Sequence, residues 1–164
     1  MIIRALTDED FVQYKVPSMF IGIGTCNWKC CAEAGIPSSV CQNSMLAQAK
    51  PVYIDDRDLI QRYLSNDITR AIVIGGLEPF SQFSMLLTFL CKLRKDFHCY
   101  DPVVIYTGFY PGEIAEQISL LRYQYAINNL IVKFGRYVPG YEPHVDNVLG
   151  VKLANPQQYA LRIS

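Results

Sequence analysis

The sequence lacks an excess of charge of either sign and lacks any long apolar run. Fifteen basic residues balance fifteen acidic ones, so no overall field draws the chain toward nucleic acid or an anionic membrane. No apolar run approaches membrane-spanning length, and the first ten residues hold an arginine and three acids where a secretory signal needs an unbroken apolar stretch. We therefore expect a soluble, cytoplasmic protein that binds neither nucleic acid nor membranes.

Repeats, low-complexity tracts and linkers are also absent, which indicates a single domain over residues 1–164. A chain of this length, 51% hydrophobic and only 18% charged, can bury a sizeable core without disulfide bonds. In a reducing cytoplasm, its six cysteines favour metal binding or catalysis over disulfide formation.

Short β-branched or aromatic runs alternate with helical patterns along the chain. The alternation predicts βαβ units, and therefore an α/β fold with a mostly parallel sheet. Strands are expected at Ser18 to Ile23, Ala71 to Ile74, Val103 to Thr107 and Leu130 to Lys133, with a short edge strand at Val148 to Leu153. Helical apolar faces occur within Arg57 to Asn66, Phe83 to Leu93 and Ile114 to Leu121.

Chemically distinctive residues follow each of the four main strands. In a parallel α/β sheet the ligand site gathers beyond the carboxyl ends of the strands. The segments at those ends are a cysteine-rich loop, Gly75 to Pro79, Thr107-Gly108, and Lys133 to Tyr137. We therefore expect the cysteines to share one edge of the sheet with two glycine-containing turns, a carboxylate and a lysine.

Four of the six cysteines lie within sixteen residues, at positions 26, 30, 31 and 41. Such clustering predicts thiolates that converge on one metal centre. Three thiolates can hold three irons of a four-iron cluster and leave the fourth iron open to a small molecule. In this interpretation Cys26, Cys30 and Cys41 are the ligands, and Cys31 is a spare cysteine or replaces its neighbour.

A structural zinc site is the main alternative for these cysteines. It would take three ligands from the cluster, with Cys99 or His98 as the fourth. Unliganded or redox-active cysteines are a third interpretation. Cys91 lies on the apolar face of a predicted helix and is most simply a small core residue.

The glycine-rich turn after residue 74 also has two interpretations. Gly75 and Gly76 would let a ligand approach backbone amides, and Glu78 would bind an ammonium group through a charge-assisted hydrogen bond. Alternatively, this is an ordinary strand-to-helix turn, in which Glu78 lies in the first turn of the helix and is stabilised by the helix dipole. Thr107 and Lys133 also have two interpretations. Each is either part of the site, or Thr107 belongs to a plain turn and Lys133 is a solvated residue at a strand end.

Two of these motifs resemble the radical S-adenosylmethionine enzymes. One runs from Phe20 to Cys30 and continues with Cys41-Gln42-Asn43, and the other is the run from Ile72 to Pro79. More narrowly, the chain is similar to the small activating enzymes of anaerobic ribonucleotide reductase. Those enzymes share a threonine-glycine-aromatic turn, found here at residues 107–109, and a polar stretch like residues 153–158. The resemblance extends from about residue 18 to residue 158.

The resemblance implies a fold and a ligand set. The fold would be a partial (β/α) barrel of the radical S-adenosylmethionine type, with a curved, mostly parallel sheet. The three cysteines at 26, 30 and 41 would ligate a [4Fe-4S] cluster, whose open iron would chelate the amino and carboxylate groups of S-adenosylmethionine (SAM). Gly75, Gly76 and Glu78 would line the methionine end of SAM, and Thr107 and Lys133 would lie near its ribose or carboxylate.

The resemblance also implies an oxidoreductase activity. The reduced cluster would cleave SAM to methionine and a 5'-deoxyadenosyl radical, with an electron from a donor such as flavodoxin or ferredoxin. An activating enzyme would use that radical to install a glycyl radical on a partner such as anaerobic ribonucleotide reductase. A second hypothesis is a small radical SAM enzyme acting on a small molecule or peptide. A third, of another class, is a non-catalytic zinc-binding module.

Overall fold

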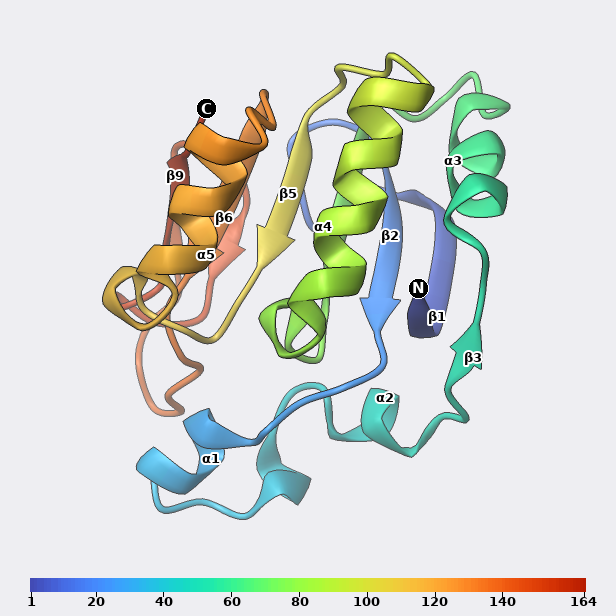
Figure 1. The fold of residues 1–164 in the computed structure, drawn as a ribbon. Helices are drawn as coiled ribbons and strands as arrows, with labels where there is room; N and C mark the ends of the chain where they lie inside the picture. The colour runs from blue at the N-terminus through green and yellow to red at the C-terminus, as the bar shows by residue number, and fades with distance from the viewer.

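A computed structural model describes all 164 residues of the chain (Figure 1). The strands are β1 (Ile2–Asp10), β2 (Ser18–Ile23), β3 (Val52–Tyr53), β4 (Ala71–Gly76), β5 (Val103–Tyr106), β6 (Leu130–Phe134), β7 (His144–Val145), β8 (Lys152–Leu153) and β9 (Tyr159–Arg162). The α-helices are α1 (Lys29–Glu33), α2 (Ser44–Gln48), α3 (Asp56–Leu64), α4 (Phe83–Cys91) and α5 (Ala115–Ser119). Single π-helical turns, Lys92–Asp96 and Leu120–Gln124, extend α4 and α5.

Seven strands form one open sheet in the order β3-β1-β2-β4-β5-β6-β9. The four central strands β2, β4, β5 and β6 are parallel, whereas β1, β3 and β9 pair antiparallel at the two sides. The predicted α/β fold around a parallel central sheet is therefore confirmed. The edge strands β3 and β9 do not pair with each other, so the sheet does not close into a barrel.

The four strands predicted for the centre of the sheet are confirmed, with ends that shift by no more than two residues. The predicted edge strand Val148 to Leu153 is wrong. Only its last two residues form a strand, and they pair with β7 in a separate two-stranded sheet. The Asp146 carboxylate accepts hydrogen bonds from the amides of Val148 and Leu149, which folds that part of the chain into a turn instead.

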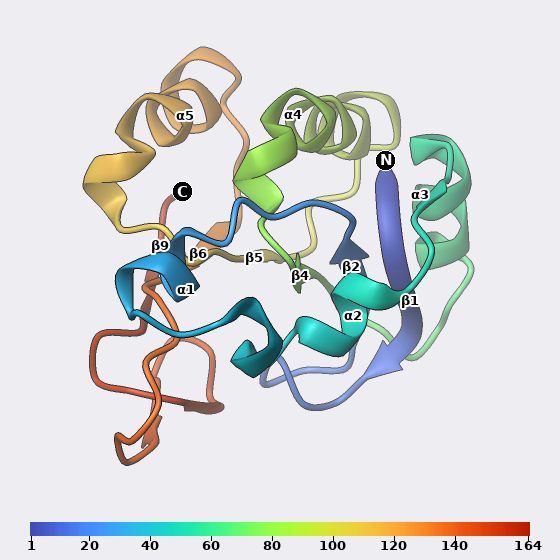
Figure 2. The same cartoon turned by 90° about the horizontal axis from the view of Figure 1, so that it is seen from below.

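Helices α3, α4 and α5 cover one face of the sheet, as the view along the strands shows (Figure 2). The larger hydrophobic core of 24 buried residues lies on this face, and its members include Phe89, Leu90 and Ile105. The opposite face carries a smaller core, where Leu149 and Leu153 pack near Val73 and Val104. None of the helices has the length and apolarity that crossing a bilayer requires.

Residues 24–49, which include α1 and α2, lie across the carboxyl ends of the parallel strands (Figures 1 and 2). Arg4 on β1 fixes both ends of this stretch. Its guanidinium donates to the carbonyl of Gly24, at the end of β2, and to the carbonyls of Ala47 and Ala49, at the end of α2. The cysteine-rich segment is therefore attached to the sheet and does not extend away from it.

Candidate metal and cofactor site

One cavity of about 480 Å³ lies at the carboxyl ends of the parallel strands. Its volume is within the range of small-molecule and cofactor sites. Seven of the eight predicted site residues line it, and they come from the ends of all four central strands: Cys26, Cys30, Cys41, Gly76, Glu78, Thr107 and Lys133. The structure therefore brings together side chains that are up to 107 positions apart in the sequence.

The cysteine loop turns sharply between its first two cysteines. Trp28 adopts a left-handed backbone conformation, with φ of 58°, immediately before α1. Such a conformation is uncommon for a bulky residue and is found where the surrounding structure or a function requires it. The turn places Cys26 and Cys30 on the wall of the same cavity.

Backbone amides point at two of the sulfur atoms. The amide of Trp28 donates to Cys26 Sγ at 3.3 Å, and the amide of Asn43 donates to Cys41 Sγ at 3.4 Å. Burial raises the pKa of Cys26 to about 11, and the Trp28 amide opposes that rise. Amide donors of this kind favour the thiolate form, which is the form that binds metals.

Cys31 is the cysteine of the four that does not line the cavity. Its side chain is buried, whereas that of Cys30 contributes to the cavity wall. The pKa of Cys31 is raised to about 11, mainly by burial and in addition by the neighbouring thiols of Cys30 and Cys41. The four cysteines are therefore close together: three line the cavity, and Cys31 is buried next to the thiols of Cys30 and Cys41.

No group of three or more His, Cys, Asp or Glu side chains is close enough to hold a single metal ion. A tetrahedral zinc site needs sulfur atoms about 2.3 Å from one point. A four-iron cluster is larger, and its cysteine ligands bind different irons. The thiols of Cys26, Cys30 and Cys41 therefore line one cavity without forming a site for a single metal ion.

The carboxylate of Glu78 is buried and held by three hydrogen bonds. Its Oε1 atom accepts from the Thr107 hydroxyl at 2.7 Å and from the Phe80 amide at 3.1 Å, and Oε2 accepts from the Gly108 amide at 2.9 Å. Glu78 therefore caps the turn after β4, as the simpler interpretation expected, and also reaches the end of β5. A carboxylate has about four acceptor positions, so Oε2 has one left for a ligand.

Gly108 lies between Glu78 and the cysteine loop. A Cβ atom added at this glycine would be 3.6 Å from Glu78 Oε2 and 4.0 Å from Cys30 Sγ. The carboxylate and the second cysteine of the loop therefore face the same backbone position. The sequence predicts Thr107-Gly108 as a turn at this edge of the sheet, but it gives no signal for the contacts of Gly108 with Glu78 and Cys30.

Lys133 is 6% exposed and lines the cavity from β6. Its ammonium donates to the carbonyl of Gly135 at 2.9 Å and lies 5.9 Å from the centre of the Tyr106 ring. Burial lowers the pKa of Lys133 to about 7, and the nearby Glu78 and Cys30 oppose that change. Burial raises the pKa of Glu78, opposed by its three hydrogen bonds and by Lys133. An ammonium has three donors, so two remain for a ligand.

The two adjacent glycines have different roles. Gly76 has φ of 82°, and a Cβ atom there would lie 2.4 Å from Leu46 Cδ2 of α2. This glycine therefore lets α2 approach the sheet. Gly75 does not line the cavity, because a Cβ atom there would meet Tyr106 and Phe20 at 3.1 and 3.5 Å. It makes room for these aromatic side chains, which themselves line the cavity.

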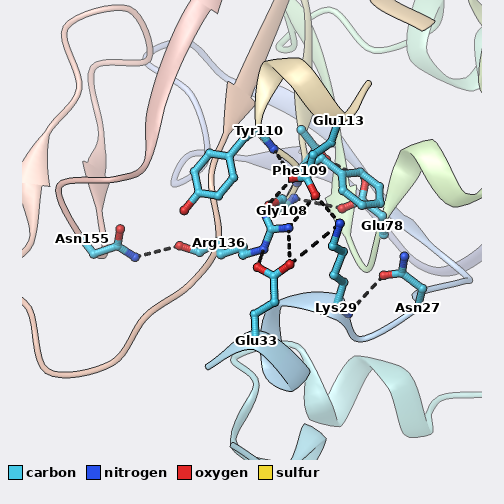
Figure 3. Close-up of polar contacts among 11 residues, drawn as sticks. Asn27, Lys29, Glu33, Glu78, Gly108, Phe109, Tyr110, Glu113, Arg136 and Asn155 are labelled. Atoms are coloured by element: carbon cyan, nitrogen blue, oxygen red, sulfur yellow. Dashed lines mark hydrogen bonds and ion pairs between the residues drawn. The ribbon is translucent and has the colours of Figure 1, made fainter. Parts of the chain in front are cut away.

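A group of charged residues that sequence reasoning missed attaches α1 to the sheet (Figure 3). We call Lys29, Glu33, Glu113 and Arg136 the ionic clamp. Arg136 follows β6 and is 5% exposed, and its guanidinium contacts both carboxylates of the clamp. Asn155 in turn donates to the Arg136 carbonyl at 2.9 Å. No local pattern indicates the clamp, because Arg136 and Glu33 are 103 positions apart.

Comparison with known proteins gives no assignment. No family model matches the chain, and neither a curated protein nor a solved structure matches it significantly.

Proposed function

We propose that this protein is a radical SAM enzyme that holds a [4Fe-4S] cluster. The observation that carries the proposal is the convergence of Cys26, Cys30 and Cys41 with Glu78 on one cavity at the carboxyl ends of a parallel sheet. Three thiols and a buried carboxylate are the donors that a cluster with one open iron and an amino acid ligand require. We further propose that the open sheet is a partial barrel of the radical SAM type, with the cavity at the carboxyl ends of its parallel strands.

The cysteine loop would hold the cluster through its three cavity-facing sulfur atoms. When bound, the cluster would supply the electron that cleaves SAM to methionine and a 5'-deoxyadenosyl radical. The amides of Trp28 and Asn43 would stabilise the thiolate ligands by hydrogen bonding. Cys31 would not be a ligand, because it does not line the cavity.

The polar residues of the cavity would bind and orient SAM. The free acceptor position on Glu78 Oε2 would take the SAM ammonium, while Thr107 and Gly108 hold the carboxylate in place. The two free donors of Lys133 would bind the SAM carboxylate or a ribose hydroxyl. Thr107 already donates its hydroxyl proton to Glu78, so its role would be to orient Glu78.

The hydrogen donor would be a glycine of a partner enzyme such as anaerobic ribonucleotide reductase, and the electron donor a protein such as flavodoxin or ferredoxin. The cavity is open to solvent on one side, and this supports a substrate as large as a protein. Val12 lines the cavity but is 70% exposed, so this side of the site faces solvent. A partner loop could therefore reach the SAM-binding residues from outside.

Anaerobic purification and reconstitution with iron and sulfide would test the proposal. We expect a brown protein with about four irons per chain. After reduction with dithionite it should convert SAM to 5'-deoxyadenosine. Cys91→Ala, which changes a cysteine outside the cavity, is the matched control and should behave like wild type. A colourless zinc protein with no SAM cleavage would refute the proposal and support a zinc-binding module.

A second measurement would identify the substrate class. Mixing the reduced enzyme, SAM and anaerobic ribonucleotide reductase should produce a glycyl signal in electron paramagnetic resonance. SAM cleavage without that signal would instead support an enzyme that acts on a small molecule or peptide.

A further inference from the structure

The ionic clamp holds α1 at both of its ends. Lys29, the first residue of α1, forms an ion pair with Glu113, and Glu33, the last, pairs with Arg136 (Figure 3). Cys30 lies between these two residues, one position after Lys29. The position of this sulfur atom therefore depends on how α1 is attached.

Arg136 is the centre of the clamp. Its Nη1 and Nη2 atoms each donate to a different oxygen of Glu113 at 2.7 Å. Its Nε and Nη2 atoms contact the two oxygens of Glu33 at 2.5 and 3.0 Å. The bidentate pair with Glu113 fixes orientation as well as distance, because the guanidinium and the carboxylate are both planar. Toward Glu33 only the Nη2 contact is a hydrogen bond, and the Nε contact is an ion pair. A lysine at position 136 could not form these paired contacts, because its ammonium group is not planar.

The clamp is continuous with the candidate site through Gly108. Arg136 Nη1 donates to the carbonyl of Gly108 at 3.2 Å, and the amide of the same residue donates to Glu78 Oε2. Cys30 Sγ lies beside this glycine on the cavity side. One guanidinium therefore contacts both the helix that carries Cys30 and the turn that holds Glu78.

We propose that Arg136, acting through Glu33, is a positioning residue that holds Cys30 at the cavity wall beside Glu78. This proposal rests on the proposed function in one respect, namely that Cys30 is a cluster ligand. The contacts that hold Cys30 in place are those of the protein without a cluster, so its positioning can also be tested in the iron-free protein. The clamp contributes to the attachment of α1 beyond the buried side chain of Cys31, and α1 needs such contacts because its five residues are too few to be stable as an isolated helix.

The test uses the iron-free, reduced protein and measures the alkylation rate of each cysteine with iodoacetamide by peptide mass spectrometry. The main variant is Glu33→Ala, because residue 33 is exposed and alanine favours a helix, so folding should be unaffected. We expect Cys30 to react about fivefold faster or more, while Cys91 keeps its rate and the thermal midpoint is unchanged. Glu33→Gln should give an intermediate rate, since one acceptor oxygen remains.

Arg62→Met is the matched control. Arg62 also makes a bidentate pair, with Asp8 at 2.5 and 2.6 Å, but this pair lies outside the cavity. Its loss should leave Cys30 unchanged. An unaltered Cys30 rate in Glu33→Ala, or an equal rise in Arg62→Met, would overturn the proposal.

The loaded protein gives an independent readout. Glu33→Ala should lose iron to a chelator about tenfold faster than wild type, as expected for the loss of a residue that orients a ligand. If wild type binds no iron, the proposed function fails, yet the alkylation rates still decide whether the clamp positions Cys30. If wild type binds iron, and Glu33→Ala has the wild-type rates of both Cys30 alkylation and iron loss, the clamp has no positioning role.

Discussion

The Thr107 hydroxyl donates a 2.7 Å hydrogen bond to Oε1 of Glu78, which joins the ends of β4 and β5 inside the site. Both side chains are buried, with 2% and 5% of their surface exposed. A carboxylate removed from water must be hydrogen-bonded to remain charged. This contact therefore helps to determine whether Glu78 can attract an ammonium group.

Thr107→Val should destabilise the protein by about 1–3 kcal/mol, because Glu78 Oε1 and the Phe109 amide each lose a buried partner. Urea unfolding at pH 7 would measure the loss. Thr107→Ser keeps the hydroxyl, so its free energy of unfolding should be close to that of wild type. Equal destabilisation by the two substitutions would show that the hydrogen bond contributes little.

Lys133 should make the free energy of unfolding depend on pH. Its pKa is about 7 in the folded protein, below the value near 10.4 of an unfolded lysine. Between these values the unfolded state binds more protons, so stability rises with pH. Between pH 7 and pH 8.5, the stability of wild type relative to Lys133→Met should therefore rise by about 1.5 kcal/mol.

Urea unfolding of both proteins at pH 7 and pH 8.5 would check this expectation. Lys152→Met is the matched control, because Lys152 lines the same cavity but is exposed. It should follow the wild-type dependence on pH. A difference between wild type and Lys133→Met that does not vary with pH would contradict the expectation.

Single cysteine replacements should separate ligands from the spare cysteine. Cys26→Ala, Cys30→Ala and Cys41→Ala should each abolish cluster binding, because each removes one of three cavity-facing thiols. Cys31→Ala should keep about four irons per chain, since its side chain does not line the cavity. Iron and sulfide analysis after anaerobic reconstitution provides the measurement. Retention of iron in Cys30→Ala with its loss in Cys31→Ala would reverse the assignment.

Gly76→Ala should displace α2 as well as strain the backbone. The new methyl group would meet Leu46 at 2.4 Å, and φ of 82° disfavours alanine, so a loss of about 2–4 kcal/mol is expected. Gly35→Ala isolates the backbone effect, because Gly35 has φ of 63° and no atom near its Cβ position. It should cost only about 1 kcal/mol. Thermal or urea unfolding would compare them, and equal losses would argue against the contact with α2.

The sequence was most informative for strands buried on both faces. The runs from Ser18 and Ala71 are continuous apolar segments, which is the pattern of central parallel strands. The strand β1 was missed because it contains charged residues and its pairing with β2 shifts register twice, which breaks the alternating pattern. The strand β9 was missed because its four residues are too short a signal.

The same contrast holds for the site. Cys26, Glu78, Thr107 and Lys133 could be predicted because each lies at or within three residues of the carboxyl end of a central strand, and parallel strands end at one edge. Arg136 could not be assigned a role from sequence. Its partners are 23 and 103 positions away, and only the packed structure shows that two carboxylates, of Glu113 and Glu33, converge on it.

The attachment of residues 24–49 at two places also bears on cysteine spacing. Arg136 fixes the end of α1 through Glu33, and Arg4 fixes the end of α2 through Ala47. The chain between these helices is therefore a surface loop with both ends held. Doubling the length of such a loop raises its closure free energy by only about 0.6 kcal/mol. The ten residues that separate Cys30 from Cys41 could therefore lengthen or shorten by several positions while both sulfur atoms stay at the cavity.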